Sequence, residues 1–203
     1  MRTLFLAFLL LAAGLPAKAG PEASPGQLVA ERSRAVLAAL AERREAFRKD
    51  PEALHAFVRE QLDSVFDRDY SARLVLGRNG RDVDAEKLEA FADALTRNLL
   101  RRYGDALLEV DPGLEVRVKA ETPLRGGRIV RVATEIQRRS GPPVPVDYLF
   151  HQTAAGWRAF DVIVEGVSYV QTYRSQFDQL LRSESLDSLT AKLARGEIRP
   201  GEG

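Results

Sequence analysis

The sequence predicts an α+β domain in which several helices pack against one face of a four-stranded antiparallel sheet. Apolar residues recur at helical spacing from Gln27 to Tyr103, and they alternate with polar residues from Leu114 to Glu165. The helical spacing returns after Gly166. Such a sheet, covered on its apolar face by helices, forms either a filled core or a cavity, and the spacing alone leaves both open.

The start of the chain has the composition of a secretory signal peptide. Arg2 supplies a positive charge, residues 4–13 form an apolar run of ten, and Ala17-Lys18-Ala19 fits a cleavage site. A membrane anchor is the alternative, but a bilayer span requires roughly 20 apolar residues. We therefore expect residues 1–19 to be removed and residues 20–203 to form a single exported domain.

The exported chain is close to electrical neutrality. From residue 20 onward it carries 28 basic and 29 acidic side chains, a net charge of −1. Proteins that bind nucleic acid or anionic lipid surfaces through charge carry a basic excess, so we expect neither partner. Cysteine is absent, so packing rather than disulfides must stabilise the domain. A chain of this length can bury one substantial core.

Four helices are expected before the sheet, after a linker at residues 20–26. Asp50-Pro51 favours a helix start, because aspartate caps helix N-termini and proline fits the first turn. Gly77 is typical of a helix end. The expected helices cover residues 27–47, 51–65, 68–77 and 88–103, with a polar turn at 78–84.

Four runs of alternating residues predict the strands. They cover residues 114–119, 130–136, 144–151 and 157–165. The runs are separated by Gly126-Gly127, Gly141-Pro142-Pro143 and Ala154-Ala155-Gly156, and turns this short join antiparallel neighbours. One face of this sheet should be apolar and the other mostly charged. Two more helices are expected at 170–181 and 186–193.

Residues suited to catalysis or metal binding are few. The two histidines, His55 and His151, are isolated, and the absence of cysteine argues further against a zinc site. Asp161 and Glu165 lie four apart on one expected strand and so share a face, where they could act in acid–base chemistry. A cross-strand ion pair with Arg131 is the interpretation that we favour. We therefore assign no catalytic residue and no metal ligand.

Three tyrosines, Tyr148, Tyr169 and Tyr173, fall on or beside the expected apolar face. In a filled core each hydroxyl would need a hydrogen-bond partner. At the mouth of a cavity, the ring can line an apolar wall while the hydroxyl faces water. The sequence does not decide between these two placements.

Four blocks of the sequence resemble the MlaC family, the toluene-tolerance Ttg2 family. They are WRAFDVIVEGVSYVQTYRSQF at 157–177, YSARLVLG at 70–77, EAFADALTRNLLRRYG at 89–104 and LDSLTAKL at 186–193. The resemblance extends over about residues 28–193. The chain departs from the family pattern at Asn79-Gly80, where an aromatic residue is frequent, and at Ser185, where glycine is frequent. Both departures lie in connections between elements.

The resemblance implies a periplasmic phospholipid carrier rather than an enzyme. Proteins of this family hold acyl chains between sheet and helices. They shuttle lipid between an outer-membrane lipoprotein complex and an inner-membrane ABC transporter with an MCE-domain subunit, which maintains outer-membrane lipid asymmetry. We expect an NTF2-like arrangement with an apolar cavity, in a monomer that needs no cofactor besides its phospholipid cargo.

Such a cargo requires an enclosed apolar site. Two acyl chains carry roughly 30 methylenes, and at about 0.8 kcal/mol each their exposure to water would cost about 25 kcal/mol. On the fourth strand, Phe160, Val162 and Val164 compete with Ile163 for the inner face. The predicted lipid-binding residues are Val116, Val118, Val130, Val132, Val146, Tyr148, Phe150, Val164, Tyr169 and Tyr173.

Two other functions stay open at this point. The first is a periplasmic adaptor with a filled core, which co-purified phospholipid would exclude. The second is a small NTF2-like enzyme that uses Asp161 or Glu165, which requires a polar pocket with an inward-facing carboxylate.

Overall fold

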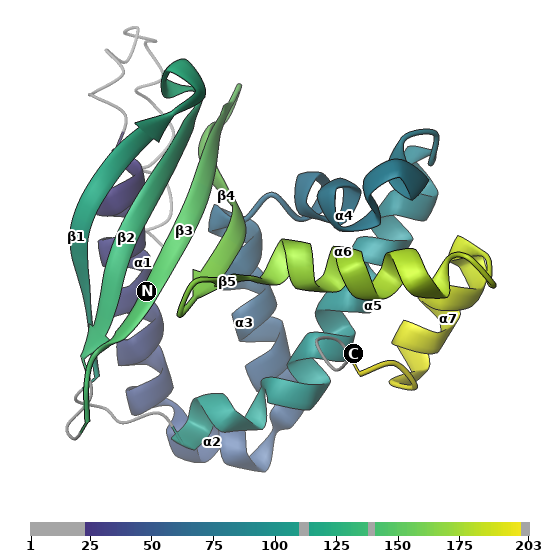
Figure 1. Cartoon of the computed structure of the whole chain (residues 1–203). Helices are drawn as coiled ribbons and strands as arrows, with labels where there is room; N and C mark the ends of the chain where they lie inside the picture. The colour runs from purple at the N-terminus through teal and green to yellow at the C-terminus, as the bar shows by residue number, and fades with distance from the viewer. Residues whose placement is uncertain (1–22, 110–113, 138–140, 200–203) are drawn as a thin grey trace, which may run out of the picture.

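The computed structural model describes residues 23–109, 114–137 and 141–199. An antiparallel sheet packs against helices, as the sequence predicts (Figure 1). The expected signal peptide, residues 1–19, lies outside the described residues. Among the described helices, none combines the length and the apolar character needed to cross a membrane.

Five α-helices and two short 3-10 helices precede the sheet. Asp50 caps one of these helices as predicted, because its carboxylate accepts a hydrogen bond of 3.1 Å from the backbone N–H of Ala53. Gly77 ends another with a positive φ of 57°. The elements are α1 (Pro25–Glu42), α2 (Arg44–Lys49), α3 (Pro51–Val65), α4 (Arg68–Leu76), η1 (Gly77–Gly80), α5 (Ala85–Tyr103) and η2 (Asp105–Glu109).

The prediction of one continuous helix over residues 27–47 is wrong. The helix breaks at Arg43, where φ is −99° and ψ is 11°, and α2 starts in a new direction. The change of direction allows the fully buried Phe47 to join Leu40 and Leu54 in one apolar cluster. No glycine or proline stands at the break, so the sequence carries no local signal for it.

The sheet has five strands in sequential order, one more than predicted. They are β1 (Glu115–Leu124), β2 (Ile129–Gln137), β3 (Val144–Thr153), β4 (Gly156–Val164) and β5 (Val167–Ser168), with the 3-10 turn η3 (Arg125–Gly127) between the first two. The additional strand is two residues long, too short for an alternating pattern. Glu165 and Gly166, at φ 51° and 84°, form the turn into it, so β4 ends one residue earlier than predicted.

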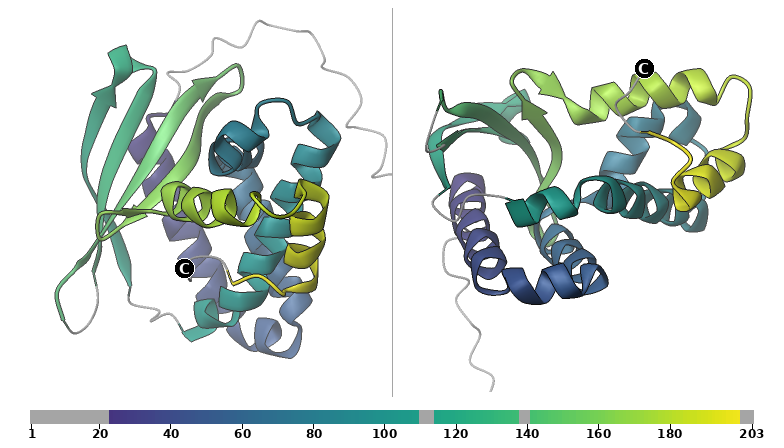
Figure 2. Two further views of the ribbon diagram at one scale, coloured as in Figure 1. Left: turned by 45° about the vertical axis from the view of Figure 1, so that its right-hand side comes forward. Right: turned by 90° about the horizontal axis from the view of Figure 1, so that it is seen from below.

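The helices form two groups around the sheet. In the first group α1 and α3 run along one face of the sheet, as the view from below shows (Figure 2). In the second group α4 and α5 pack with α6 (Tyr169–Leu180) and α7 (Leu186–Arg195) beside β4 and β5. The sheet face that α1 and α3 cover is called the inner face below.

Buried apolar side chains fall into three clusters rather than one core. The largest, the helical core, belongs to α4–α7: Ala72, Val75, Leu76, Leu88, Phe91, Ala92, Ala94, Leu95, Val170, Tyr173, Phe177, Leu189 and Leu193. The sheet cluster, on the inner face and α1, is smaller: Val29, Val130, Val132, Phe150 and Ala159. A third cluster joins α1, α2, α3 and η2: Leu40, Phe47, Leu54 and Leu108.

Candidate functional site

The inner face of the sheet carries apolar side chains in rows that cross the strands. One row pairs Val132, Tyr148 and Val162 on β2, β3 and β4. The next row runs from Val118 through Thr134 and Val146 to Val164. β-branched and aromatic residues suit this half-covered pleated surface, and their register places them on one side.

The helices cover this face unevenly. At one end Val132 and Phe150 are fully buried in the sheet cluster, against Val29 of α1. Toward the other end Val116 and Val118 of β1 are only half-buried. Val162 and Val164 of β4 are also half-buried. The inner face therefore offers apolar surface that the protein does not fully cover.

Eight of the ten predicted lipid-binding residues lie together on this face. Four of them are buried: Val130, Val132, Val146 and Phe150. The other four are half-buried: Val116, Val118, Tyr148 and Val164. The structure therefore gathers them on one surface, and their contact with lipid stays a prediction.

The remaining two predicted residues lie on α6, away from the sheet cluster. Tyr173 is buried in the helical core, where its ring stacks on Phe177 at 6.2 Å between centroids. Tyr169 begins α6 and is 44% exposed. Its ring meets that of Tyr173 edge-on at 5.8 Å. The structure therefore separates these two tyrosines from Tyr148.

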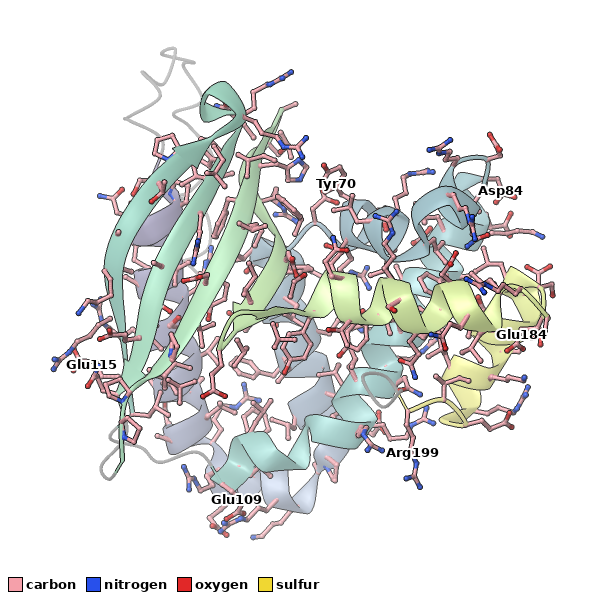
Figure 3. The ribbon with its side chains drawn as sticks, in the orientation of Figure 1. Tyr70, Asp84, Glu109, Glu115, Glu184 and Arg199 are labelled. Atoms are coloured by element: carbon pink, nitrogen blue, oxygen red, sulfur yellow. The ribbon has the colours of Figure 1, made fainter. Side chains whose placement is uncertain are left out.

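A β-bulge decides which side chains of β4 face inward. The register between β3 and β4 shifts between Leu149 and Phe150, which leaves Phe160 without an opposite residue. Phe160 packs edge-on against Tyr70, labelled in Figure 3, at 5.2 Å between ring centroids. Beyond the bulge, Val162 and Val164 share the inner face with Tyr148 and Val146.

Several residues of this face were not among the predicted ten. Val162 is one of them, and its register opposite Tyr148 places it on the inner face. Trp157 of β4 and Val29 of α1 also pack in the sheet cluster. The apolar spacing of these residues can be read from the sequence. The bulge, and the packing of α1 on the sheet, arise from contacts between distant segments and leave no local pattern.

Among the polar side chains of the inner face, Thr134 and Tyr148 lie in the middle of its apolar rows. The hydroxyl of Thr134, almost fully buried, donates a 2.6 Å hydrogen bond to the backbone carbonyl of Val146. Burial raises the pKa of the Tyr148 phenol above its ordinary value, so this hydroxyl stays neutral at physiological pH. Neither group adds a charge to the apolar surface.

The predicted pairing of Asp161 with Arg131 is wrong. The Asp161 carboxylate is 4% exposed and accepts hydrogen bonds from the Ser168 hydroxyl at 2.6 Å and from the Val170 backbone N–H at 3.1 Å. Arg131 donates to Asp147, with Nε 2.9 Å from Oδ2. Asp161 therefore fixes the start of α6 to the sheet, a role that depends on how β5 returns along β4.

The expected sharing of a face by Asp161 and Glu165 is also wrong, because Glu165 lies in the turn after β4. An Asp161 carboxylate held by two donors is unlike a free general base.

Within the described ranges, no three His, Cys, Asp or Glu side chains are grouped to hold a metal ion. His151 lies with Nε2 2.9 Å from a carboxylate oxygen of Asp67 and stacks on Tyr70 at 4.3 Å between ring centroids.

Comparison with known proteins gives one family. The family model described as MlaC protein matches residues 30–195. The toluene tolerance protein ttg2D of Pseudomonas putida is 25% identical over 182 residues, covering 88% of this chain and 83% of that protein. The intermembrane phospholipid transport system binding protein MlaC of Haemophilus influenzae is 21% identical over 198 residues, covering 96% and 92%.

A solved structure has the same fold. It is the phospholipid-binding protein from Ralstonia solanacearum in complex with a phospholipid, with a TM-score of 0.77 and 20% sequence identity. The alignment covers 86% of this chain and 97% of that one. The predicted α+β fold is therefore confirmed by a solved structure as well as by the elements described above.

Proposed function

We propose that this chain, which belongs to the MlaC family, binds a phospholipid on the inner face of its sheet and carries it through the periplasm. The observation that carries the proposal is the set of half-buried apolar residues on that face, which includes Val118, Val162 and Val164. Apolar surface that a protein leaves uncovered is typical of a binding site. The phospholipid-bound Ralstonia protein of the same fold supports the choice of ligand.

The energetics favour this face for acyl chains. Each methylene moved from water to an apolar surface contributes about 0.8 kcal/mol, so two chains need an extensive apolar contact. The inner face offers β-branched and aromatic side chains, with Thr134 satisfied by the backbone and Tyr148 neutral. The carboxylate of Glu121, which the register places on the same face, is exposed to solvent, so among the described residues of this face no buried charge opposes the entry of a hydrocarbon chain.

The resemblance to the family supports a finer proposal. We expect the chain to receive and deliver lipid between an outer-membrane lipoprotein complex and an inner-membrane ABC transporter with an MCE-domain subunit, as a monomer without a further cofactor. The near-neutral exported chain suits this role, because a shuttle must leave each membrane after delivery. Binding and release need no catalytic group, so no enzymatic step is proposed.

Native mass spectrometry of the protein purified from the periplasm tests the proposal. Wild-type protein should carry phospholipid, and Val118→Asp should lose it, because the new carboxylate lies among acyl chains. Thr122→Asp is the matched control: Thr122 is a β-branched residue of the same strand, exposed and paired opposite Arg131. This control should keep its lipid.

Lipid-free wild-type protein would contradict the proposal and favour a filled-core adaptor. Circular dichroism of both variants separates loss of lipid from loss of fold. If Val118→Asp unfolds, the bulkier but apolar Val118→Phe should still displace lipid by occupying its space.

A further inference from the structure

One row of the inner face loses its cover step by step toward the sheet edge. The row runs across β2, β3, β4 and β5 through Thr134, Val146, Val164 and Val167. Thr134 is 2% exposed, Val146 is 4% exposed and Val164 is half-buried, whereas Val167 is 57% exposed. Because the register places all four on one face, the three valines extend the apolar surface from the covered sheet to open solvent.

The next residue of the chain with a large apolar side chain extends this edge. Tyr169, one residue beyond β5, is 44% exposed and begins α6. We call Val167 and Tyr169 together the apolar lip. Four large apolar side chains are exposed among the described residues, and two of them form this lip. Exposed apolar residues that gather at one edge indicate a surface with a binding role.

The lip is held in place from both sides. Before it, the backbone N–H of Glu165 donates to the carbonyl of Pro145 at 3.0 Å. Between its two residues, the Ser168 hydroxyl donates to the buried Asp161, which also accepts from the Val170 backbone. These bonds fix β5 and the first turn of α6 against β4, so the exposure of Val167 is built into the fold.

Given the proposed lipid binding, on which this step rests, we infer that the apolar lip is the portal through which acyl chains enter and leave the inner face. An acyl chain that contacts Val167 on its way to the inner face stays against apolar surface while it leaves the water. This contact lowers the barrier to transfer. The lip therefore acts on the rate of lipid exchange in both directions. The amount of lipid bound at equilibrium is set by the inner face itself.

Transfer of a fluorescent acyl-labelled phospholipid from phosphatidylethanolamine–phosphatidylglycerol vesicles to delipidated protein tests the portal. Val167→Asp should slow the initial transfer rate about tenfold, since one lost apolar side-chain contact is of that size. Leu124→Asp is the matched control. Leu124 is 37% exposed and is the last residue of β1, which forms the edge of the sheet opposite to β5 (Figure 1). Its transfer rate should stay within about twofold of wild type.

A second variant guards against a folding defect in the first. Tyr169→Gln replaces the exposed ring with a polar side chain that suits a helix and brings no charge near the buried Asp161, so the fold should be kept while transfer slows. Equal transfer rates for both lip variants and Leu124→Asp would overturn the portal. So would lower final occupancy at an unchanged rate. Wild-type protein that takes up no lipid would instead contradict the proposed function.

Discussion

The helical core and the inner face of the sheet are both apolar, but they differ in how completely they are covered. In the helical core, Phe91 and Phe177 are fully buried and meet edge-on at 5.8 Å between ring centroids. On the inner face, Val118 and Val164 remain half-buried although helices run beside the sheet. One region is packed as a protein interior, and the other leaves surface available for a ligand.

This difference shows how the chain can leave apolar sheet surface uncovered without disulfides. Cysteine is absent from the whole sequence, so packing must supply the stability. The helical core supplies it locally, with buried side chains from four helices that contact one another rather than the sheet. Asp161 then fastens this rigid unit to β4, so the inner face can stay open without the domain coming apart.

The largest expected loss of stability comes from a substitution that leaves a cavity in the helical core. Phe177→Ala should lower the free energy of unfolding by about 3–5 kcal/mol, because a fully buried phenylalanine is lost with its neighbours fixed around it. Val162→Ala on the inner face should cost less than about 1 kcal/mol, since its side chain is only half-buried. Urea denaturation of delipidated protein measures both. Equal losses would remove the distinction between the two regions.

Substitutions that add volume should distinguish the two regions by a smaller change in stability. Ala94→Phe should cost about 1–3 kcal/mol, because Ala94 is fully buried in the helical core and no space exists for a ring. Val164→Phe should be tolerated in delipidated protein, since the half-buried site has room, but it should lower phospholipid occupancy. Thermal denaturation and native mass spectrometry read the two outcomes. A large stability loss in Val164→Phe would show that the inner face is already filled.

Local sequence patterns predicted most of the elements but not how they meet. Alternation located four strands, because each half-covered strand must repeat every two residues. β5 is not predicted, because two residues are too few to show an alternating pattern. The break at Arg43 is not predicted either, because no glycine or proline marks it. These features follow from long-range packing, as when Phe47 turns into its cluster.

The candidate site shows the same limit. Eight of the predicted residues fall on one face, because strand periodicity fixes side-chain direction. The bulge that turns Phe160 away lies in the pairing of two strands and has no pattern within either strand. Tyr173 lies on the apolar face of α6, as the helical periodicity predicts. This face packs in the helical core rather than on the sheet, because of the direction in which α6 leaves the sheet. The partner of Asp161 likewise depends on that path.

The smallest expected effect concerns Tyr148, which packs against the sheet cluster at the border of the half-buried surface. Burial raises its pKa in the folded protein above the ordinary value near 10. As pH rises through 10, the unfolded chain loses this proton while the folded protein keeps it, so the free energy of unfolding falls until the folded pKa is passed. Below that range the phenol is protonated in both states and contributes no pH dependence.

Tyr148→Phe removes this alkaline loss while leaving the ring in place. At pH 7 its free energy of unfolding should differ from wild type by less than about 1 kcal/mol, and above pH 10 it should fall less steeply. Bound lipid should bury the phenol further and raise its pKa again, so spectroscopic titration of tyrosinate should differ between lipid-loaded and delipidated wild type. Identical titrations would place Tyr148 wholly with the packed end of the sheet and outside the ligand surface.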